Sequence, residues 1–140
     1  MNSKEEISPK KYLEQIEKYN TFIVQKKAEK EEVKKDTKDI SGNDYIERIK
    51  KLEHLIDEEI VTLAEERHRI INEIQSLSKE KHVHILFERY VKMKSLVEIA
   101  AAENYTYEYI KMLHGRALSD FSDNILKKRN KKNQKLSTCF

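Results

Sequence analysis

The scarcity of helix-breaking residues constrains this chain more than any other feature of its sequence. Its 140 residues include only two glycines and one proline. A sandwich, a barrel or a doubly wound sheet needs many more turn-forming residues than that. The long stretches rich in Lys, Glu, Ile and Leu therefore predict an all-α protein built largely from long helices.

Several other protein classes are not indicated by the sequence. No apolar run approaches the ~20 residues that a membrane-spanning helix needs, and the first six residues, MNSKEE, contain no apolar signal region. The one cysteine, Cys139, is too few for an internal disulfide and fits a reducing compartment. We therefore expect a cytoplasmic protein with no membrane partner.

The first half of the chain predicts two long helices. Ser8-Pro9 has the residues preferred at a helix start, and a second helix is expected from Tyr45 to Leu77, after a break at residues 40–44. Every seventh residue of the second helix is apolar, from Ile49 onward. This coiled-coil-like stripe is covered either by the first helix, folded back as a hairpin, or by a second copy of the chain. We favour the hairpin, and a homodimer through residues 44–77 stays open.

The next part of the chain predicts three shorter helices, over about 79–92, 96–102 and 106–121. Ser95 and Glu98 have the spacing of a capping box, Asn104 tolerates the positive φ of a tight turn, and Thr106 should cap the last helix. We therefore expect a helical hairpin or coiled-coil segment at 1–77, a helix-turn-helix domain at 78–125 and a basic tail at 126–140.

A helix-turn-helix domain leaves one face of its last helix exposed. The buried face is predicted at Ile110, Leu113, Ala117 and Leu118. Side chains of the other face would enter the major groove of DNA, where residues near the helix start contact bases and basic residues contact phosphates. These side chains are Tyr107, Glu108, Lys111, Met112, His114 and Arg116.

The same region resembles a known protein family. The residues that carry the resemblance are Leu86, Tyr90, Leu96, Glu98, Ile99, Ala100, Asn104, Tyr105, Thr106, Ile110, Leu113, Ala117, Leu118 and Phe121. Over about residues 77–121 the chain resembles region four of bacterial sigma factors. It resembles more closely the small proteins of phages and mobile elements of low-GC Gram-positive bacteria, among them phage late-transcription regulators. It departs from their pattern at Glu103 and Asn104, where an apolar residue and a glycine are usual.

The resemblance implies a DNA-binding transcriptional regulator of phage or mobile-element genes. It implies that helix 106–121 reads double-stranded DNA and that the same domain contacts RNA polymerase. The candidate DNA-binding residues lie on this helix, in the segment before it and in the basic tail. They are Lys92, Lys94, Ser95, Thr106, Tyr107, Glu108, Tyr109, Lys111, Met112, His114, Arg116, Lys127, Lys128 and Arg129.

The distribution of charge favours an alternative function. Residues 79–123 hold 7 basic and 7 acidic residues, whereas residues 124–140 add 6 basic residues and no acidic one. A neutral domain neutralises few DNA phosphates and gains little affinity from them. The alternative is therefore an interaction adaptor that binds RNA polymerase or another host protein without reading DNA.

Metal binding and catalysis are not indicated. His82 and His84 are two residues apart and so lie on different faces of a helix, and no third metal ligand lies near them in the sequence. No phosphate-binding glycine motif or nucleophile motif occurs. We therefore expect no metal, no cofactor and no enzyme activity.

Overall fold

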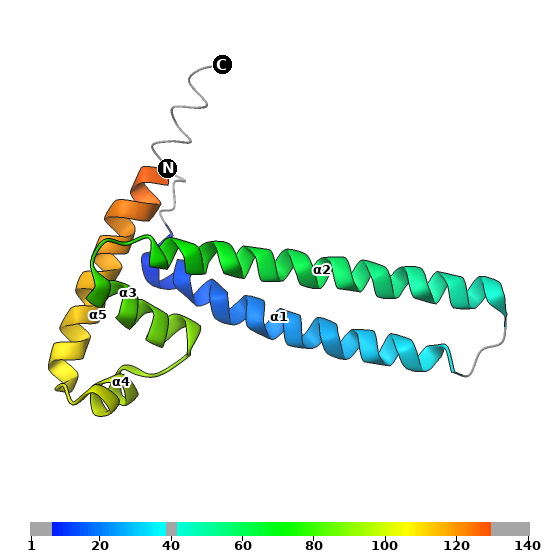
Figure 1. Cartoon of the computed structure of the whole chain (residues 1–140), viewed down its shortest axis with the longest axis horizontal. Helices are drawn as coiled ribbons and strands as arrows, with labels where there is room; N and C mark the ends of the chain where they lie inside the picture. The colour runs from blue at the N-terminus through cyan, green and yellow to red at the C-terminus, as the bar shows by residue number, and fades with distance from the viewer. Residues whose placement is uncertain (1–6, 39–41, 130–140) are drawn as a thin grey trace, which may run out of the picture. The chain divides into compact units, whose positions relative to one another are not determined.

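The computed structural model describes residues 7–38 and 42–129, and every regular element within these ranges is a helix (Figure 1). The predicted all-α class is therefore confirmed. The helices are α1 (Pro9–Asp36), α2 (Asn43–Gln75), α3 (Glu80–Leu86), α4 (Leu96–Glu103) and α5 (Tyr107–Phe121). Two π-helical turns, η1 (Phe87–Val91) and η2 (Ser122–Leu126), directly continue α3 and α5.

The start of α1 follows from its first residues. The Oγ atom of Ser8 accepts a hydrogen bond from the backbone N–H of Lys11 at 3.2 Å. Pro9 occupies the first helical position, where a missing N–H costs nothing. The predicted helix start is therefore confirmed.

Residues 18–69 form one compact unit from parts of α1 and α2. Lys30 pairs with Asp57 at 2.7 Å, and Lys26 pairs with Glu59 at 3.3 Å. Lys26 precedes Lys30 in α1, whereas its partner Glu59 follows Asp57 in α2. The two helices therefore run antiparallel within this unit. Three buried residues form an apolar cluster against which Ile60 packs; they are Val33, Ile49 and Ile56.

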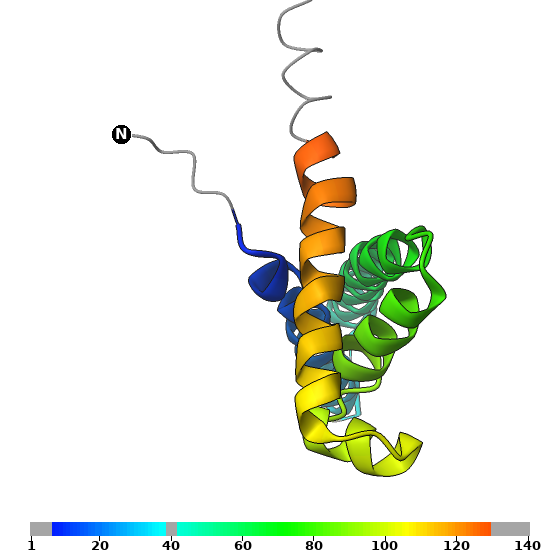
Figure 2. The ribbon, with the colours of Figure 1, turned by 90° about the vertical axis from the view of Figure 1, so that its left-hand side faces the viewer.

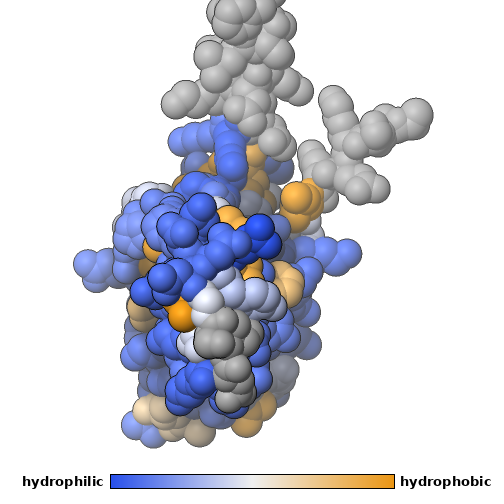
Figure 3. All heavy atoms as spheres, turned by 90° about the vertical axis from the view of Figure 1, so that its right-hand side faces the viewer, coloured by the Kyte–Doolittle hydropathy of each residue, from blue (hydrophilic) through white to orange (hydrophobic). Residues whose placement is uncertain are grey.

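The surface of this unit keeps some apolar side chains exposed. On α2 they include Tyr45, Leu52, Leu55 and Val61, each at least 42% exposed. The face of the molecule in Figure 3 is mainly hydrophilic, with hydrophobic residues scattered between polar ones. Scattered exposed apolar residues are usual on protein surfaces, so they do not by themselves indicate a dimer, and the homodimer stays a prediction.

The second compact unit contains residues 7–17 together with 70–129. The first turns of α1 and the last turns of α2 belong to it, because Leu13, Ile16, Ile70 and Ile74 are completely buried. The ring of Tyr12 lies 5.7 Å from that of Phe121 at the end of α5. The sequence pattern predicts a boundary at residue 77, whereas these apolar side chains are part of the C-terminal core.

The segment expected to be a basic tail begins as a helix. Lys127–Arg129 are helical and continue η2 (Figure 2). Arg129 donates a hydrogen bond to the hydroxyl of Tyr12 at 2.8 Å and lies 3.7 Å from Glu73. These contacts attach the end of the helix to α1 and α2. Residues 130–140 lie outside the described part of the chain.

No helix within the described ranges is both long and apolar enough to cross a membrane.

The packing of residues 18–69 predicts different effects for two neighbouring residues of α2. Ile56 is 1% exposed, whereas Leu55 is 55% exposed. Ile56→Ala should lower the free energy of unfolding by about 2–5 kcal/mol, because it leaves a cavity in the apolar cluster. Leu55→Ala should change it by less than about 0.5 kcal/mol. Urea unfolding measures both, and equal effects would contradict the packing described here.

Candidate nucleic-acid interface

Local hydrogen bonds set the direction of α4 and α5. The hydroxyl of Ser95 accepts from the backbone N–H of Glu98 at 3.1 Å, and the carboxylate of Glu98 accepts from the N–H of Ser95 at 3.0 Å. Asn104 ends α4 with a φ of 59°, in the left-handed region. The hydroxyl of Thr106 then accepts from the N–H of Tyr109 at 3.1 Å. The predicted capping box, turn residue and cap are all confirmed.

The buried side of α5 packs against α3 and α4. Ile110, Ala117 and Phe121 are at most 1% exposed, and Ile99 and Ala100 on α4 are also buried. The remaining predicted core residues of α5 lie at the edge of this contact and are half-buried; they are Leu113 and Leu118. Because one side of α5 is fully used in this way, its other side is left to the solvent.

A polar contact also links α5 to α3. Nδ1 of His82 lies 2.7 Å from a carboxylate oxygen of Asp120, and both side chains are largely buried. The amide of Asn124 donates to the same carboxylate. Burial alone would raise the pKa of Asp120, but the hydrogen bonds from His82 and Asn124 outweigh it and lower the pKa below its ordinary value. His82 therefore has a structural partner.

His114 is expected to face the groove of DNA, but the structure places its ring in a contact with Tyr90. Its Nε2 lies 2.8 Å from the hydroxyl of Tyr90, and the two rings stack with centroids 5.7 Å apart. Burial lowers the pKa of His114 and raises the pKa of Tyr90 to about 12. His114 follows Ile110 by four residues and precedes Ala117 by three, so helical geometry places it beside the buried side.

Most of the other candidate residues on α5 are exposed. Tyr107 is 44% exposed and Met112 is 41% exposed. Glu108, Lys111 and Arg116 are exposed as well. At 3.6 residues per turn, these five residues spread over the half of the circumference of α5 that is not buried, with Tyr107 and Arg116 at its two edges. That side mixes two bulky apolar groups with charges of both signs.

Three further candidates have intramolecular roles. Tyr109 is half-buried, and its ring lies 4.8 Å from that of Tyr105 in the turn. Thr106 is exposed, but its hydroxyl is engaged in the helix cap. The same holds for Ser95, whose hydroxyl caps α4. The geometry of these side chains accounts for them without a ligand.

Lys92 and Lys94 are expected to hold phosphates, but both pair with a carboxylate of their own chain. Lys94 lies 2.6 Å and Lys92 3.2 Å from the buried side chain of Glu88. The hydrogen bond from Lys94 lowers the pKa of Glu88 despite its burial and raises the pKa of Lys94. Because two ammonium groups share one carboxylate, pairing with Glu88 cancels only one of their two positive charges.

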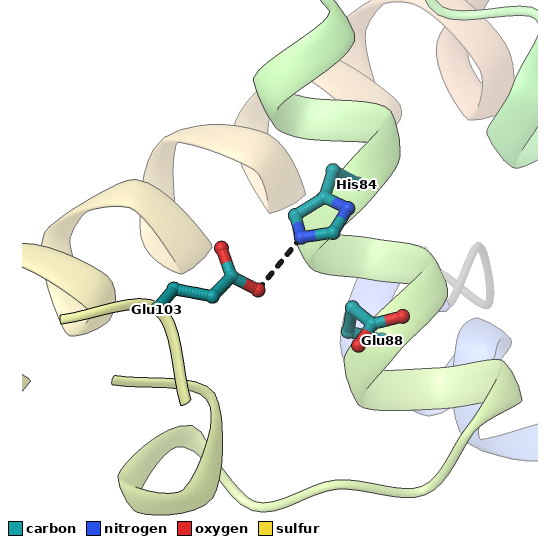
Figure 4. A group of neighbouring side chains, drawn as sticks. All are labelled: His84, Glu88 and Glu103. Atoms are coloured by element: carbon teal, nitrogen blue, oxygen red, sulfur yellow. Dashed lines mark hydrogen bonds and ion pairs between the residues drawn. The ribbon is translucent and has the colours of Figure 1, made fainter. Parts of the chain in front are cut away.

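The structure brings Glu103 to His84 and Glu88, which are one helical turn apart. The sequence spacing did not indicate Glu103. Nε2 of His84 lies 2.7 Å from Glu103 at the end of α4, and a carboxylate oxygen of Glu88 completes a group whose ligand atoms lie within 4.8 Å of one another (Figure 4). A divalent ion here would have to displace the ammonium groups of Lys92 and Lys94 from Glu88. The ion pairs therefore suffice to explain this cluster, which links α4 to the end of α3.

A groove lies between the start of α3 and α5, with a volume of about 1010 Å³. Its walls include four cations, Lys79 and Lys81 on one side and Lys111 and Arg116 on α5. The sequence alone does not indicate the first two, because the stretch Lys79-Glu80-Lys81 has the composition of an ordinary solvated helix start. Only the packing of α3 against α5 places them opposite the exposed face of α5.

Lys127 and Lys128 are exposed on the helical extension, where Lys127 pairs with Asp123 at 3.1 Å. Arg129 is engaged with Tyr12 and Glu73. The structure thus separates the candidates into two groups. Tyr107, Glu108, Lys111, Met112 and Arg116 share one open face, and the other candidates lie elsewhere or have partners.

Comparison with known proteins adds no further constraint. No family model, no curated protein and no solved structure matches this chain.

Gly115 leads to a prediction about stability. It lies inside α5, and a Cβ atom built there meets nothing within 4 Å. Glycine inside a helix is about 1 kcal/mol less favourable than alanine. Gly115→Ala should therefore raise the free energy of unfolding by about 0.5–1 kcal/mol in urea unfolding.

The reverse exchange on an exposed site of α1, Ala28→Gly, provides the control and should lower the free energy of unfolding by a similar amount. A loss of stability on Gly115→Ala would contradict the open surroundings of this residue.

Proposed function

We propose that this protein is a sequence-specific, DNA-binding transcriptional regulator that reads the major groove with α5. One observation carries the proposal. Two capped helices, α4 and α5, are joined by a short turn at Asn104, and α5 buries one side while it exposes the other. These features support a helix-turn-helix unit, in which the second helix contacts bases.

The dimensions of α5 suit this role. Its 15 residues give a rod of roughly 22 Å, and a helix fits into the major groove, which is about 12 Å wide. Tyr107, Glu108, Lys111 and Met112 lie in its first two turns, the part that meets base edges in such units.

The side chains on the open face provide suitable chemistry for base contacts. Lys111 donates to the acceptors of guanine, Glu108 accepts from the amino group of cytosine, and Met112 contacts the methyl group of thymine. Arg116, one turn further along α5, would contact a phosphate. The proposal that the targets are phage or mobile-element genes rests on the resemblance of residues 77–121 to regulators of such elements.

A second function is favoured by a different observation. Val97 on α4 is 63% exposed and Tyr107 on α5 is 44% exposed, so this domain has apolar groups that a protein partner could cover. The alternative is therefore an adaptor that binds RNA polymerase or another protein. In that function the protein would enrich no DNA site.

The proposal predicts which substitutions abolish specific binding. The purified protein should enrich one short site from genomic fragments at about 150 mM salt. Tyr107→Ala with Lys111→Ala should then weaken binding to that site by about 30-fold or more, since each base contact contributes roughly 1–3 kcal/mol. Fluorescence anisotropy with the selected duplex and a scrambled duplex measures the loss.

A matched control removes the same two residue types from α2. Tyr45 and Lys50 are exposed there, and Tyr45→Ala with Lys50→Ala should leave the preference for the selected site unchanged. If the α5 variant keeps its preference, α5 does not read the bases. If no site is enriched, the DNA-binding proposal gives way to the adaptor.

A further inference from the structure

The groove between the start of α3 and α5 contains positive charge without carboxylate partners. Among the described residues, Lys79, Lys81, Lys111 and Arg116 form no ion pair. All four are exposed. Lys79 is close enough to Asp120 to contribute to the lowered pKa of that carboxyl, but a polyanion that enters the groove can pair with all four cations without breaking an ion pair.

The acidic residues of the same groove are mostly engaged. Asp120 is bound to His82 and Asn124, and Asp123 pairs with Lys127. Glu80 alone among the described groove residues is an acid with no ion pair. Asp120 keeps its negative charge, because these hydrogen bonds lower its pKa, whereas Lys127 balances the charge of Asp123. The four cations of the groove therefore exceed its two unbalanced carboxylates, Glu80 and Asp120.

The second, independent observation is Gly115, which also lines the groove. Nothing in the described chain occupies the space where its side chain would be. Internal packing therefore does not require a glycine here, although glycine weakens a helix. A bare patch of helix surface does allow the close approach of a ligand. Gly115 lies on the same helix as Lys111 and Arg116 and between them in sequence.

The geometry points to this groove as a binding site for the phosphates of one DNA strand. Lys79 and Lys81 would bind these phosphates from the side opposite α5. This inference rests on the proposed function and adds the start of α3 to the proposed DNA interface. A phosphate next to Gly115 would lie between the lysines of the α3 start and Arg116 of α5. The contact would be independent of base sequence, because phosphates carry no sequence information.

The test uses the full chain and a salt series. Lys79→Gln with Lys81→Gln should weaken binding to the selected duplex and to a scrambled duplex by the same factor, about tenfold at physiological salt. It should also reduce the slope of log K against log salt by about 2, since each lysine that neutralises a phosphate contributes about 1 to that slope. Lys50→Gln with Lys51→Gln removes the same charge from exposed sites on α2 and should leave the slope unchanged.

A second variant tests the close approach. The Cβ atom of Gly115→Leu meets nothing within 4 Å, and thermal unfolding checks that the variant keeps the wild-type fold. Its DNA affinity should fall by about tenfold or more. Ala28→Leu, at an exposed site on α1, should leave the affinity unchanged.

The outcomes separate this inference from the proposed function. In one outcome, the wild type selects a site while the Lys79/Lys81 variant has the same DNA affinity and salt slope as the Lys50/Lys51 control. The groove then does not bind phosphates, although α5 still reads DNA. An unchanged DNA affinity in Gly115→Leu overturns the inference in the same way. If the wild type binds neither duplex, both proposals fail, and an acidic protein segment becomes the candidate ligand.

Discussion

The burial of one side of α5 is the constraint on which the proposed interface depends. Ile110, Ala117 and Phe121 are removed from water on that side, and the contact between His82 and Asp120 fixes the same helix to α3. Because burial of apolar area is the largest favourable term in folding, the rotation of α5 about its axis is set by these residues. The open face with Tyr107, Lys111 and Met112 follows from that rotation.

The arrangement of charges resolves an apparent conflict between a neutral domain and a polyanionic ligand. Most of the acidic residues in 79–123 are used inside the chain, in ion pairs or in a helix cap. They are Glu88, Glu98, Glu103, Asp120 and Asp123. The cations of the groove have no such partners among the described residues. A neutral total is therefore compatible with a cationic face, and the position of the charges decides what the surface attracts.

Local features were predictable from the sequence, and long-range ones were not. The roles of Ser95, Asn104 and Thr106 depend on residues within four positions, so their spacing was sufficient. The partners of His114 and Lys94 could not be found in this way. Tyr90 contacts His114 only when η1 packs near α5, and Glu88 contacts Lys94 only because the chain turns after η1. Lys79 and Lys81 gained their position opposite α5 from tertiary packing alone.

Oxidative footprinting of side chains tests the central claim most directly. Tyr107 and Met112 on α5 are exposed and chemically reactive, and Tyr45 and Phe22 in residues 18–69 are exposed to a similar extent. With the selected duplex bound to the full chain, the account predicts slower oxidation of Tyr107 and Met112 and unchanged oxidation of Tyr45 and Phe22. Protection of Tyr45 and Phe22 instead, with Tyr107 and Met112 as reactive as in the free protein, would contradict it.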